Sequence, residues 1–495
     1  MKFFVRNVLL LHILLLVVAF SWIHGGTRPD LLLPVIPWLT FFMLEFLLIF
    51  PQAKSTETLA EARSRVWRSL VRDPLLYFFI ALIVLLIIPF FNVAGEPEYN
   101  VVTGEWRIPV PPMPNLPFCV DIAEHAVLLI WFVPALLAAL AAKHGLLRKG
   151  KRLLLECLCW NGAVLSIFGF IQLMTGATSV FWGDQVFAYF FSTFGYPNFA
   201  GAFFTLLFAL SVGLWFGKAS AGLVGPSTVE AIWVNAASRK KTYWLLIPIA
   251  LNLSAAIASL SRAAILLCIA VCLALGVYMI LGTWQKVAAG GRVKIVALII
   301  LVLLLGGLSF TVFAPVSLKT ELTTITFDAV SERVSGRGQY HTRVAKEIFN
   351  DHPLFGVGGW GYPHYAMTYL APEEGIQIDG GVNVHNDTLQ FLAEQGAIGC
   401  GLLVFCMLSL LNPLLWQTAR VNRYLAKTDV SKGARFAKPG WMYRLSPEII
   451  AILVGTTATI GHSLGDLPFR SPAILTVWVL ALACGVGFLP VVRNK

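Results

Sequence analysis

Runs of about 20 apolar residues recur from one end of the chain to the other, and a run of that length can cross the hydrocarbon core of a bilayer as a helix. Of the 495 residues, 57% are hydrophobic and 13% are charged, whereas soluble domains carry about 25% charged residues. We therefore predict an all-α polytopic membrane protein with about twelve transmembrane helices. The predicted spans lie near residues 8–23, 31–50, 75–92, 123–142, 153–174, 196–217, 243–260, 263–283, 295–313, 397–418, 446–463 and 473–491.

Lysine and arginine gather in alternate loops between these spans. Threading the spans through a bilayer puts all of these basic loops on one side, and the positive-inside rule makes that side the cytoplasm, with both termini there. The basic loops are 51–74, 143–152, 218–242, 284–294 and 419–445. Membrane topology thus explains the net charge of +11, and we predict no nucleic-acid partner.

The opposite side receives a long polar segment from Ala314 to Gly396, which far exceeds an ordinary connection and should fold as a small unit. Apolar periodicity predicts two helices in it, near residues 338–350 and 383–394. The chain then divides into spans one to nine, the external loop, and spans ten to twelve, at residues 1–313, 314–396 and 397–495.

Arginines on the predicted outer side are candidates for binding an anion. Arg262 lies between two spans that leave almost no loop, so its guanidinium must sit at the outer membrane–water boundary. Such a residue can be a snorkelling anchor, but anchoring arginines favour the cytoplasmic side. Arg337, with Arg343 nearby, precedes the first loop helix. A planar, permanently charged fork suits bidentate contact with a diphosphate.

His385 opens the second predicted loop helix. The positive end of a helix favours the neutral imidazole, and a neutral imidazole can accept a proton from a sugar hydroxyl. Many histidines merely cap or pack, so packing is the alternative role. Asn386 could orient a ligand hydroxyl, and Asp387 is as well explained as a charge at the start of a helix.

The chain has no recognisable pattern for a metal or a disulfide. Most of its eight cysteines fall inside apolar runs, without the spacing of a zinc site. We predict neither a metal nor a cofactor. The run from Gly356 to Gly361 has the glycine content of a phosphate-binding loop, but no strand precedes it, and we interpret it as a tight turn.

Several short motifs occur in an order that resembles the O-antigen ligase/polymerase superfamily. They span roughly residues 195–400, with a long external loop between the ninth and tenth spans. The motifs are Tyr196-Pro197-Asn198, Ser261-Arg262-Ala263-Ala264, Ser335-Gly336-Arg337, His352-Pro353-Leu354-Phe355-Gly356-Val357-Gly358, His385-Asn386, and Gly396-Ala397-Ile398-Gly399.

The resemblance implies a metal-independent glycosyltransferase of a bacterial inner membrane, with an active site that faces the periplasm. The implied donor is a glycan on undecaprenyl diphosphate. The implied acceptor is lipid A–core in ligases and another lipid-linked repeat in polymerases. His385 resembles the family's base, and Arg262 and Arg337 resemble its diphosphate-binding arginines. Asn198, Asn386 and Arg343 join them as expected substrate-binding residues.

The sequence departs from the family pattern in one place, because the stretch from Trp182 to Tyr196 contains no basic residue where relatives often carry an arginine. Ligase, polymerase and protein O-oligosaccharyltransferase remain open, since they share a superfamily and differ in acceptor. A lipid or solute transporter is the alternative from a different class. It would predict broken helices and paired charges at mid-membrane, and the sequence shows few of either.

Overall fold

The structure is a computed structural model, and it describes residues 2–183, 189–220, 240–284, 337–369, 383–431 and 446–488. The predicted span at 295–313 and most of three basic loops lie outside these residues. The chain separates into two compact units, each described by itself below. Unit 1 holds residues 1–154, 327–412 and 460–484, and unit 2 holds the remainder.

Apolar helices dominate the described chain. Five are long and apolar enough to cross a membrane, and five shorter apolar helices accompany them. Every predicted span except 295–313 overlaps an observed helix. The chain is therefore a multi-pass helical membrane protein. The long helices cover Pro74–Phe91, Ile122–Gly145, Arg148–Met174, Pro197–Ala219 and Asp387–Trp416.

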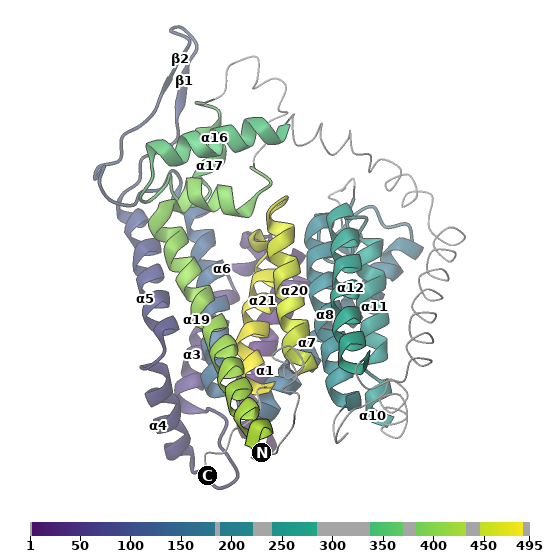
Figure 1. Cartoon of the computed structure of the whole chain (residues 1–495). Helices are drawn as coiled ribbons and strands as arrows, with labels where there is room; N and C mark the ends of the chain where they lie inside the picture. The colour runs from purple at the N-terminus through teal and green to yellow at the C-terminus, as the bar shows by residue number, and fades with distance from the viewer. Residues whose placement is uncertain are drawn as a thin grey trace. The chain divides into compact units, whose positions relative to one another are not determined.

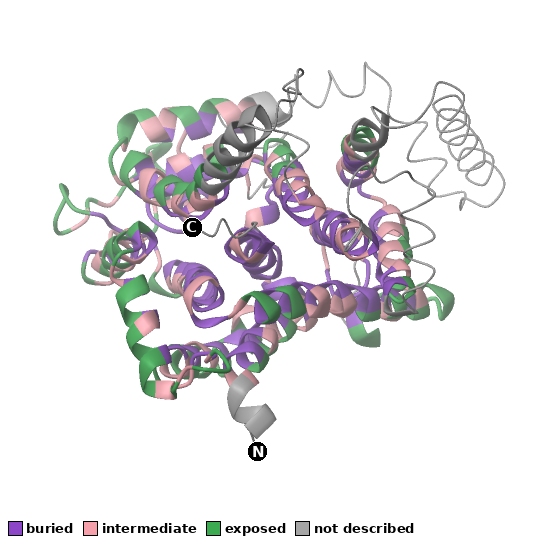
Figure 2. Ribbon diagram, turned by 60° about the horizontal axis from the view of Figure 1, so that its bottom comes forward, coloured by how far each residue is buried: buried purple, intermediate pink, exposed green. Residues whose placement is uncertain are grey.

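The membrane part of unit 1 is a bundle in which α1 packs on α3, α3 on α6, and α6 on α5. The inner faces are buried, whereas outward faces carry exposed leucine, phenylalanine and tryptophan, as expected where lipid is the solvent (Figure 2). Its helices are α1 (Lys2–Trp22), α2 (Pro29–Leu32), α3 (Ile36–Ile49), α4 (Leu59–Leu70), α5 (Pro74–Ile87), α6 (Ile122–Leu140), the first part of α19 (Asp387–Ser431) and α21 (Pro472–Gly485).

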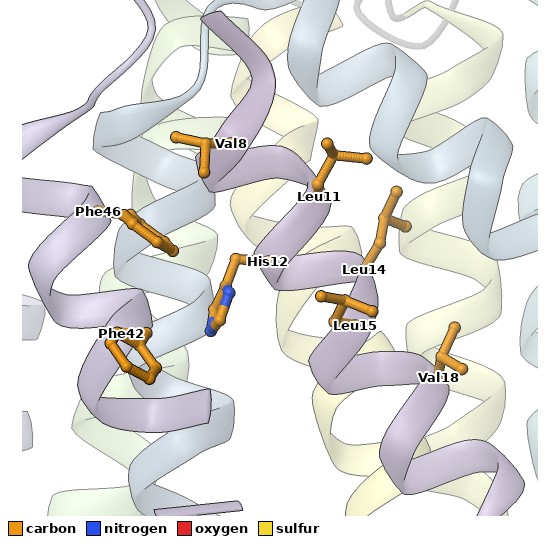
Figure 3. A pocket seen from close by; sticks show the side chains of 8 residues that line it. All are labelled: Val8, Leu11, His12, Leu14, Leu15, Val18, Phe42 and Phe46. Carbon is orange, nitrogen blue, oxygen red and sulfur yellow. The ribbon is translucent and has the colours of Figure 1, made fainter. Parts of the chain in front are cut away.

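An apolar cavity of about 550 Å³ opens between α1 and α3 (Figure 3). The imidazole of His12 contacts Phe46 with ring centroids 5.1 Å apart. Its Nε2 lies 2.9 Å from the carbonyl oxygen of Leu39 on α3. This histidine is therefore a polar tie between two helices, inside an otherwise greasy face.

A small layer lies crosswise over one end of the unit 1 bundle (Figure 1). It comprises α16 (Arg337–Asp351), α17 (Gly361–Ala366) and a hairpin of β1 (Glu98–Asn100) and β2 (Glu105–Arg107). Its own core joins Val344 and Ile348 of α16 to Tyr362 and Tyr365 of α17, and to Phe118 from the 94–123 loop. The prediction of a helix near 338–350 is confirmed.

The second predicted loop helix is wrong at both ends. Residues 383–386 are not helical, and α19 begins at Asp387. It then continues without a loop into the predicted tenth span. Asn386 is the physical reason for the late start, because its side-chain oxygen accepts from the backbone N–H of Leu389 at 3.1 Å and so caps the helix.

Unit 2 is built on α8 (Pro197–Ser220), which packs against both α11 (Leu246–Ala258) and α12 (Arg262–Trp284). Asn252 of α11 is fully buried, and its amide donates to the carbonyl of Cys159 in α7 (Arg148–Met174) at 3.2 Å. Most of α20 (Pro447–Ser463) also belongs to this unit. Three residues separate α11 from α12, which confirms the predicted tight turn before Arg262.

The buried carboxylate of Asp73 yields a prediction about stability. It caps α5 through the N–H of Leu75 and lies 2.6 Å from both Lys143 Nζ and His144 Nε2. Burial opposes ionisation, but the hydrogen bonds from His144 and Lys143 outweigh it and lower the pKa of Asp73 to about 2. The stabilisation is present above the unfolded-state pKa of about 4 and is lost as pH falls through the folded-state value.

We expect Asp73→Asn, which keeps the helix cap, to lower the free energy of unfolding at pH 7 by about 2 kcal/mol. Thermal unfolding of the detergent-solubilised protein measures this as a drop of a few degrees. Asp30→Asn is the matched control, since Asp30 forms an exposed pair with Arg28 that contributes little. Equal unfolding temperatures for the two variants would contradict the role of the buried charge.

Candidate active site

His385 lies at the point where the chain enters α19, within unit 1. Its backbone φ is 54°, in the left-handed region that residues with a Cβ rarely adopt. The side chain is 58% exposed. It precedes the helix cap Asn386 and therefore lies outside the first helical turn. The prediction that it opens the helix is wrong. Strain of this kind persists where surrounding contacts enforce it, and such positions cluster at functional sites.

A buried carboxylate stands behind the imidazole. Asp466 Oδ1 lies 3.6 Å from His385 Nδ1, and the Asp466 side chain is only 4% exposed. The same oxygen accepts from the backbone N–H of Leu467 at 2.8 Å, which fixes its position. The Asp466 carbonyl also accepts from the N–H of Asp387 at 3.2 Å. A carboxylate beside Nδ1 favours the tautomer in which Nε2 is the free acceptor.

The other described histidines of this layer make contacts with neighbouring side chains. His341 Nδ1 lies 2.9 Å from the Tyr362 hydroxyl inside the core. His364 Nε2 lies 2.8 Å from Glu124. His352 packs edge-on against Phe118, and burial lowers its pKa below the ordinary value, opposed by the nearby Asp351. Among these residues, His385 best combines exposure with a carboxylate partner.

A buried ion pair lies beneath the layer. Arg470 Nη2 donates to Glu394 Oε2 at 2.5 Å, with side-chain exposures of 2% and 0%. The guanidinium carbon sits 4.7 Å from the Trp360 ring centroid and 4.8 Å from that of Phe391. The other Glu394 oxygen accepts from Gln390 Nε2 at 3.1 Å. The pair thus links the loop after α20, the layer and α19.

Gln390 carries this network up to the residues next to His385. Its Oε1 accepts from the N–H of Val384 at 2.9 Å, and its Nε2 donates to Asn383 Oδ1 at 2.9 Å. Asn386 Nδ2 donates to the carbonyl of Leu464 at 2.9 Å. Both flanks of His385 are therefore held by side-chain amides, which fixes its backbone. Asn386 thus acts as a helix cap and as a tie to the 464–470 segment.

Two sequence motifs meet at a break in α19. Gly396 has φ 60° and ψ −170°, which interrupts the helical hydrogen bonds. The freed carbonyls of Ala393 and Glu394 accept from the N–H groups of Val357 and Gly358 at 3.0 and 2.9 Å. The segment 353–358 thus replaces the missing turn of helix.

The pairing continues on the other side of the break. The N–H groups of Ala397 and Ile398 donate to the carbonyls of Pro353 and Leu354 at 2.8 and 3.1 Å. Gly356 and Gly358 have φ of 65° and 84°, and a Cβ on either would run into backbone atoms. The glycine-rich run therefore forms a tight turn, as predicted, and its amides at 357 and 358 are used in structure.

The structure places the loop arginines on α16. Arg337 is its first residue, and its side chain lies outside the described part of the structure. Arg343 is on the exposed face, with Nε 3.8 Å from Glu347 Oε1, one helical turn away. The opposite face of α16 is buried by Val344, Ala345 and Ile348. Arg343 is therefore available to solvent on the outer surface of the layer.

Asn198 and Arg262 lie together in unit 2. Asn198 is the second residue of α8 and donates to the Tyr196 hydroxyl at 2.9 Å. Arg262 is the first residue of α12, after Ser261, whose Oγ accepts from the N–H of Ala264. Gly201, one turn into α8, faces Ser261 and Ala264 so closely that a Cβ would collide with both. The two motifs therefore share one end of this unit.

Residues 247–405 match the family model described as O-antigen ligase. Over this segment the chain is similar to that family. The matched segment runs from α11 to α19 and includes Arg262, the whole of α16, His385 and the Gly396 break. No curated protein matches the chain.

The match supports a membrane glycosyltransferase of the O-antigen ligase or polymerase type. The features that surround His385 reach beyond the matched segment, because Asp466 and Arg470 lie some sixty residues after it. Neither residue was predicted from the sequence. The sequence did contain a signal for them. An acidic and a basic residue lie four positions apart in the short connection between the last two predicted spans, on the predicted outer side.

The break at Gly396 gives a prediction with a control in the same helix. We expect Gly396→Ala to destabilise the protein by about 2 kcal/mol or more, because its φ and ψ are accessible essentially to glycine alone. A Cβ there would also strike the backbone of Leu354 and Phe355. Gly401→Ala should be neutral or stabilising, since nothing lies within 4 Å of its Cβ position and alanine favours helix. Thermal unfolding compares the two, and a benign Gly396→Ala would refute the pairing.

Proposed function

We propose that this protein is an O-antigen ligase-like glycosyltransferase. It moves a glycan from undecaprenyl diphosphate to a sugar hydroxyl of lipid A–core, with His385 as the general base. The observation that carries the proposal is the exposed imidazole of His385, held 3.6 Å from the buried carboxylate of Asp466 on a segment similar to the O-antigen ligase family.

The chemistry needs few groups. His385 accepts the proton of the acceptor hydroxyl, whose oxygen attacks the anomeric carbon of the donor glycan. A new glycosidic C–O bond forms, and the bond from the anomeric carbon to the diphosphate oxygen breaks. Undecaprenyl diphosphate leaves with the electron pair. Asp466 holds the imidazole and stabilises the imidazolium that forms, which makes it a positioning residue. We propose no metal and no cofactor.

Arginine at helix starts supports a diphosphate site. Arg262 and Arg337 are the first residues of α12 and α16, where the positive end of the helix dipole disfavours a cation. An anion reverses this cost, since it meets both the guanidinium and the positive end of the helix. We propose that both arginines bind the diphosphate, with Asn198, Asn386 and Arg343 contacting the glycans.

The proposed topology follows from the charge pattern. The 314–396 loop faces the periplasm between spans one to nine (1–313) and spans ten to twelve (397–495), and both termini are cytoplasmic. The protein lies in the bacterial inner membrane, where undecaprenyl-linked glycans are presented. Accessibility of cysteines introduced on α16 and in the 419–445 loop, probed in intact spheroplasts, tests this sidedness.

The acceptor is tested by the lipopolysaccharide of a deletion strain. Loss of all glycan-capped core, restored by the gene, supports a ligase. Core that still carries a single repeat indicates a polymerase. Normal lipopolysaccharide with loss of glycoprotein indicates a protein O-oligosaccharyltransferase. If lipid-linked glycan instead accumulates on the cytoplasmic side, the protein is a transporter and the proposal fails.

We expect His385→Ala to reduce transfer by about 10²–10⁴-fold in turnover, the usual cost of losing a general base. His385→Gln keeps hydrogen-bonding capacity but accepts no proton, so it should be nearly as inactive. Single-turnover transfer with purified protein and lipid-linked donor measures this. His364→Gln is the control, because that imidazole pairs with Glu124 away from the proposed chemistry. Near-normal transfer by His385→Gln would remove the proton-transfer role.

A second activity prediction concerns Arg262. Arg262→Lys should weaken donor use by about tenfold or more, because an ammonium cannot replace a bidentate fork. The loss should appear in the dependence of rate on donor concentration. Arg107→Lys, on the exposed β2 strand, is the control and should behave as wild type. If the two substitutions behave alike, Arg262 is an anchor in the membrane interface.

A further inference from the structure

The helix α4 has a built inner face and an unusual outer face. It begins with a capping box, in which Thr58 and Glu61 exchange side-chain and backbone hydrogen bonds. Its apolar residues Ala62, Val66 and Leu70 are buried. This face packs against α3 and the turn at the end of α6. The helix is therefore a fixed part of unit 1.

The outer face of α4 combines cations with a tryptophan. Trp67 is 59% exposed, and Arg63 and Arg68 beside it are exposed as well. Arg72 lies just beyond the end of α4 and is also exposed. Residues four apart on a helix are neighbours, so Arg63 lies one turn from Trp67, and Arg68 and Arg72 add two more exposed cations at the end of the helix. We call these four residues the α4 basic face.

The α4 basic face lies at the depth where apolar helices end. Arg63 Nε donates to the carbonyl of Ile49, the last residue of α3, at 2.8 Å. On the other side of α4 in the chain, α5 starts at Pro74. Both α3 and α5 present large apolar side chains outward, among them Phe41 and Ile80 at 60% and 49% exposure. The phosphates of the lipid headgroups lie at the ends of such lipid-facing helices, which is where α4 is found.

We propose that the α4 basic face is a binding site for anionic phospholipid, with the lipid phosphate held by its arginines and the indole of Trp67 at the level of the glycerol backbone. Cationic clusters beside a membrane span attract anionic headgroups. Tryptophan concentrates at the membrane interface because one part of its ring is apolar and its N–H is polar. This site is separate from the proposed transfer chemistry.

The geometry of the arginines favours a phosphate over a purely diffuse attraction. Arg63 and Arg68 each use Nε for a backbone carbonyl, of Ile49 at 2.8 Å and of Ser64 at 3.2 Å. Those bonds hold the two side chains at the surface. Within the described ranges, no hydrogen bond is made by the terminal nitrogens of Arg63 or Arg68. A phosphate oxygen pair matches that remaining fork.

Native mass spectrometry of the full detergent-solubilised chain, titrated with phosphatidylglycerol, tests the site. We expect Arg68→Gln with Arg72→Gln to weaken binding roughly 30-fold, since each cationic residue at an anionic surface contributes about fivefold. Arg68→Lys with Arg72→Lys should keep most of the binding. Phosphatidylcholine, which has no net charge, should bind the wild type far more weakly. Both variants avoid Arg63 and its link to α3, so they should fold.

Three results would overturn the proposal. One is equal loss of phosphatidylglycerol in Arg148→Gln with Lys149→Gln, which removes the same charge from another loop. The second is equal binding of phosphatidylcholine. The third is full displacement of the lipid by millimolar inorganic phosphate, which would make the face an anion site that does not depend on a bilayer.

Discussion

The exchange of backbone hydrogen bonds at Gly396 is the constraint on which the outer layer depends. A helix that breaks inside a membrane protein leaves backbone carbonyls and amides without hydrogen-bond partners. Each such group costs several kcal/mol in hydrocarbon. Here the segment 353–358 supplies two donors and two acceptors to the broken turn. These bonds form only when the segment 353–358 is aligned with α19 in one way. The helices α16 and α17, which flank this segment in the chain, are therefore fixed relative to α19. The start of α19, and with it His385, is held by the same element.

Buried charge serves the same end by a different route. The Arg470–Glu394 pair is enclosed by Trp360 and Phe391, so each ion is desolvated and its partner is obligatory. Such a pair adds little net stability over apolar packing, but it penalises any arrangement that separates the three elements it joins. Together with the Gln390 network, it leaves the backbone around His385 little freedom. A strained left-handed residue survives in that setting because relaxing it would unmake its neighbours' bonds.

Local patterns predicted much of this architecture. Apolar run length located the long apolar helices of the described chain, the last of them α21 (Pro472–Gly485), and the periodicity of Val344 and Ile348 located α16. The start of α19 was misplaced although Asn386-Asp387 is a good helix-start signal, because apolar spacing from residue 383 imitated a helix. The helix was predicted to end near residue 394, but it continues beyond Gly396. Its continuation depends on amides forty residues earlier in the chain, which no local pattern contains.

The candidate site was predictable only where the chemistry is carried by short motifs. His385 was predicted from its place at the start of a loop helix, and Arg262 from its place on the outer side, because anchoring arginines favour the cytoplasmic side. Asp466 and Arg470 reach the site from the far end of the sequence, and their partners become visible only in three dimensions. The same holds for Gly201, whose missing side chain lets α8 approach the turn before Arg262.

The origin of Arg470 has a consequence for how the protein is made. Glu394 is translated with the first part of α19, whereas its cation follows 76 residues later, after another apolar helix. During synthesis the carboxylate therefore waits without its partner, and a buried charge without its partner is strongly destabilising. A chain that ends before this arginine would therefore leave the Glu394 carboxylate without its ion-pair partner. Synthesis of the chain through Arg470 is therefore required before the outer layer can complete its packing.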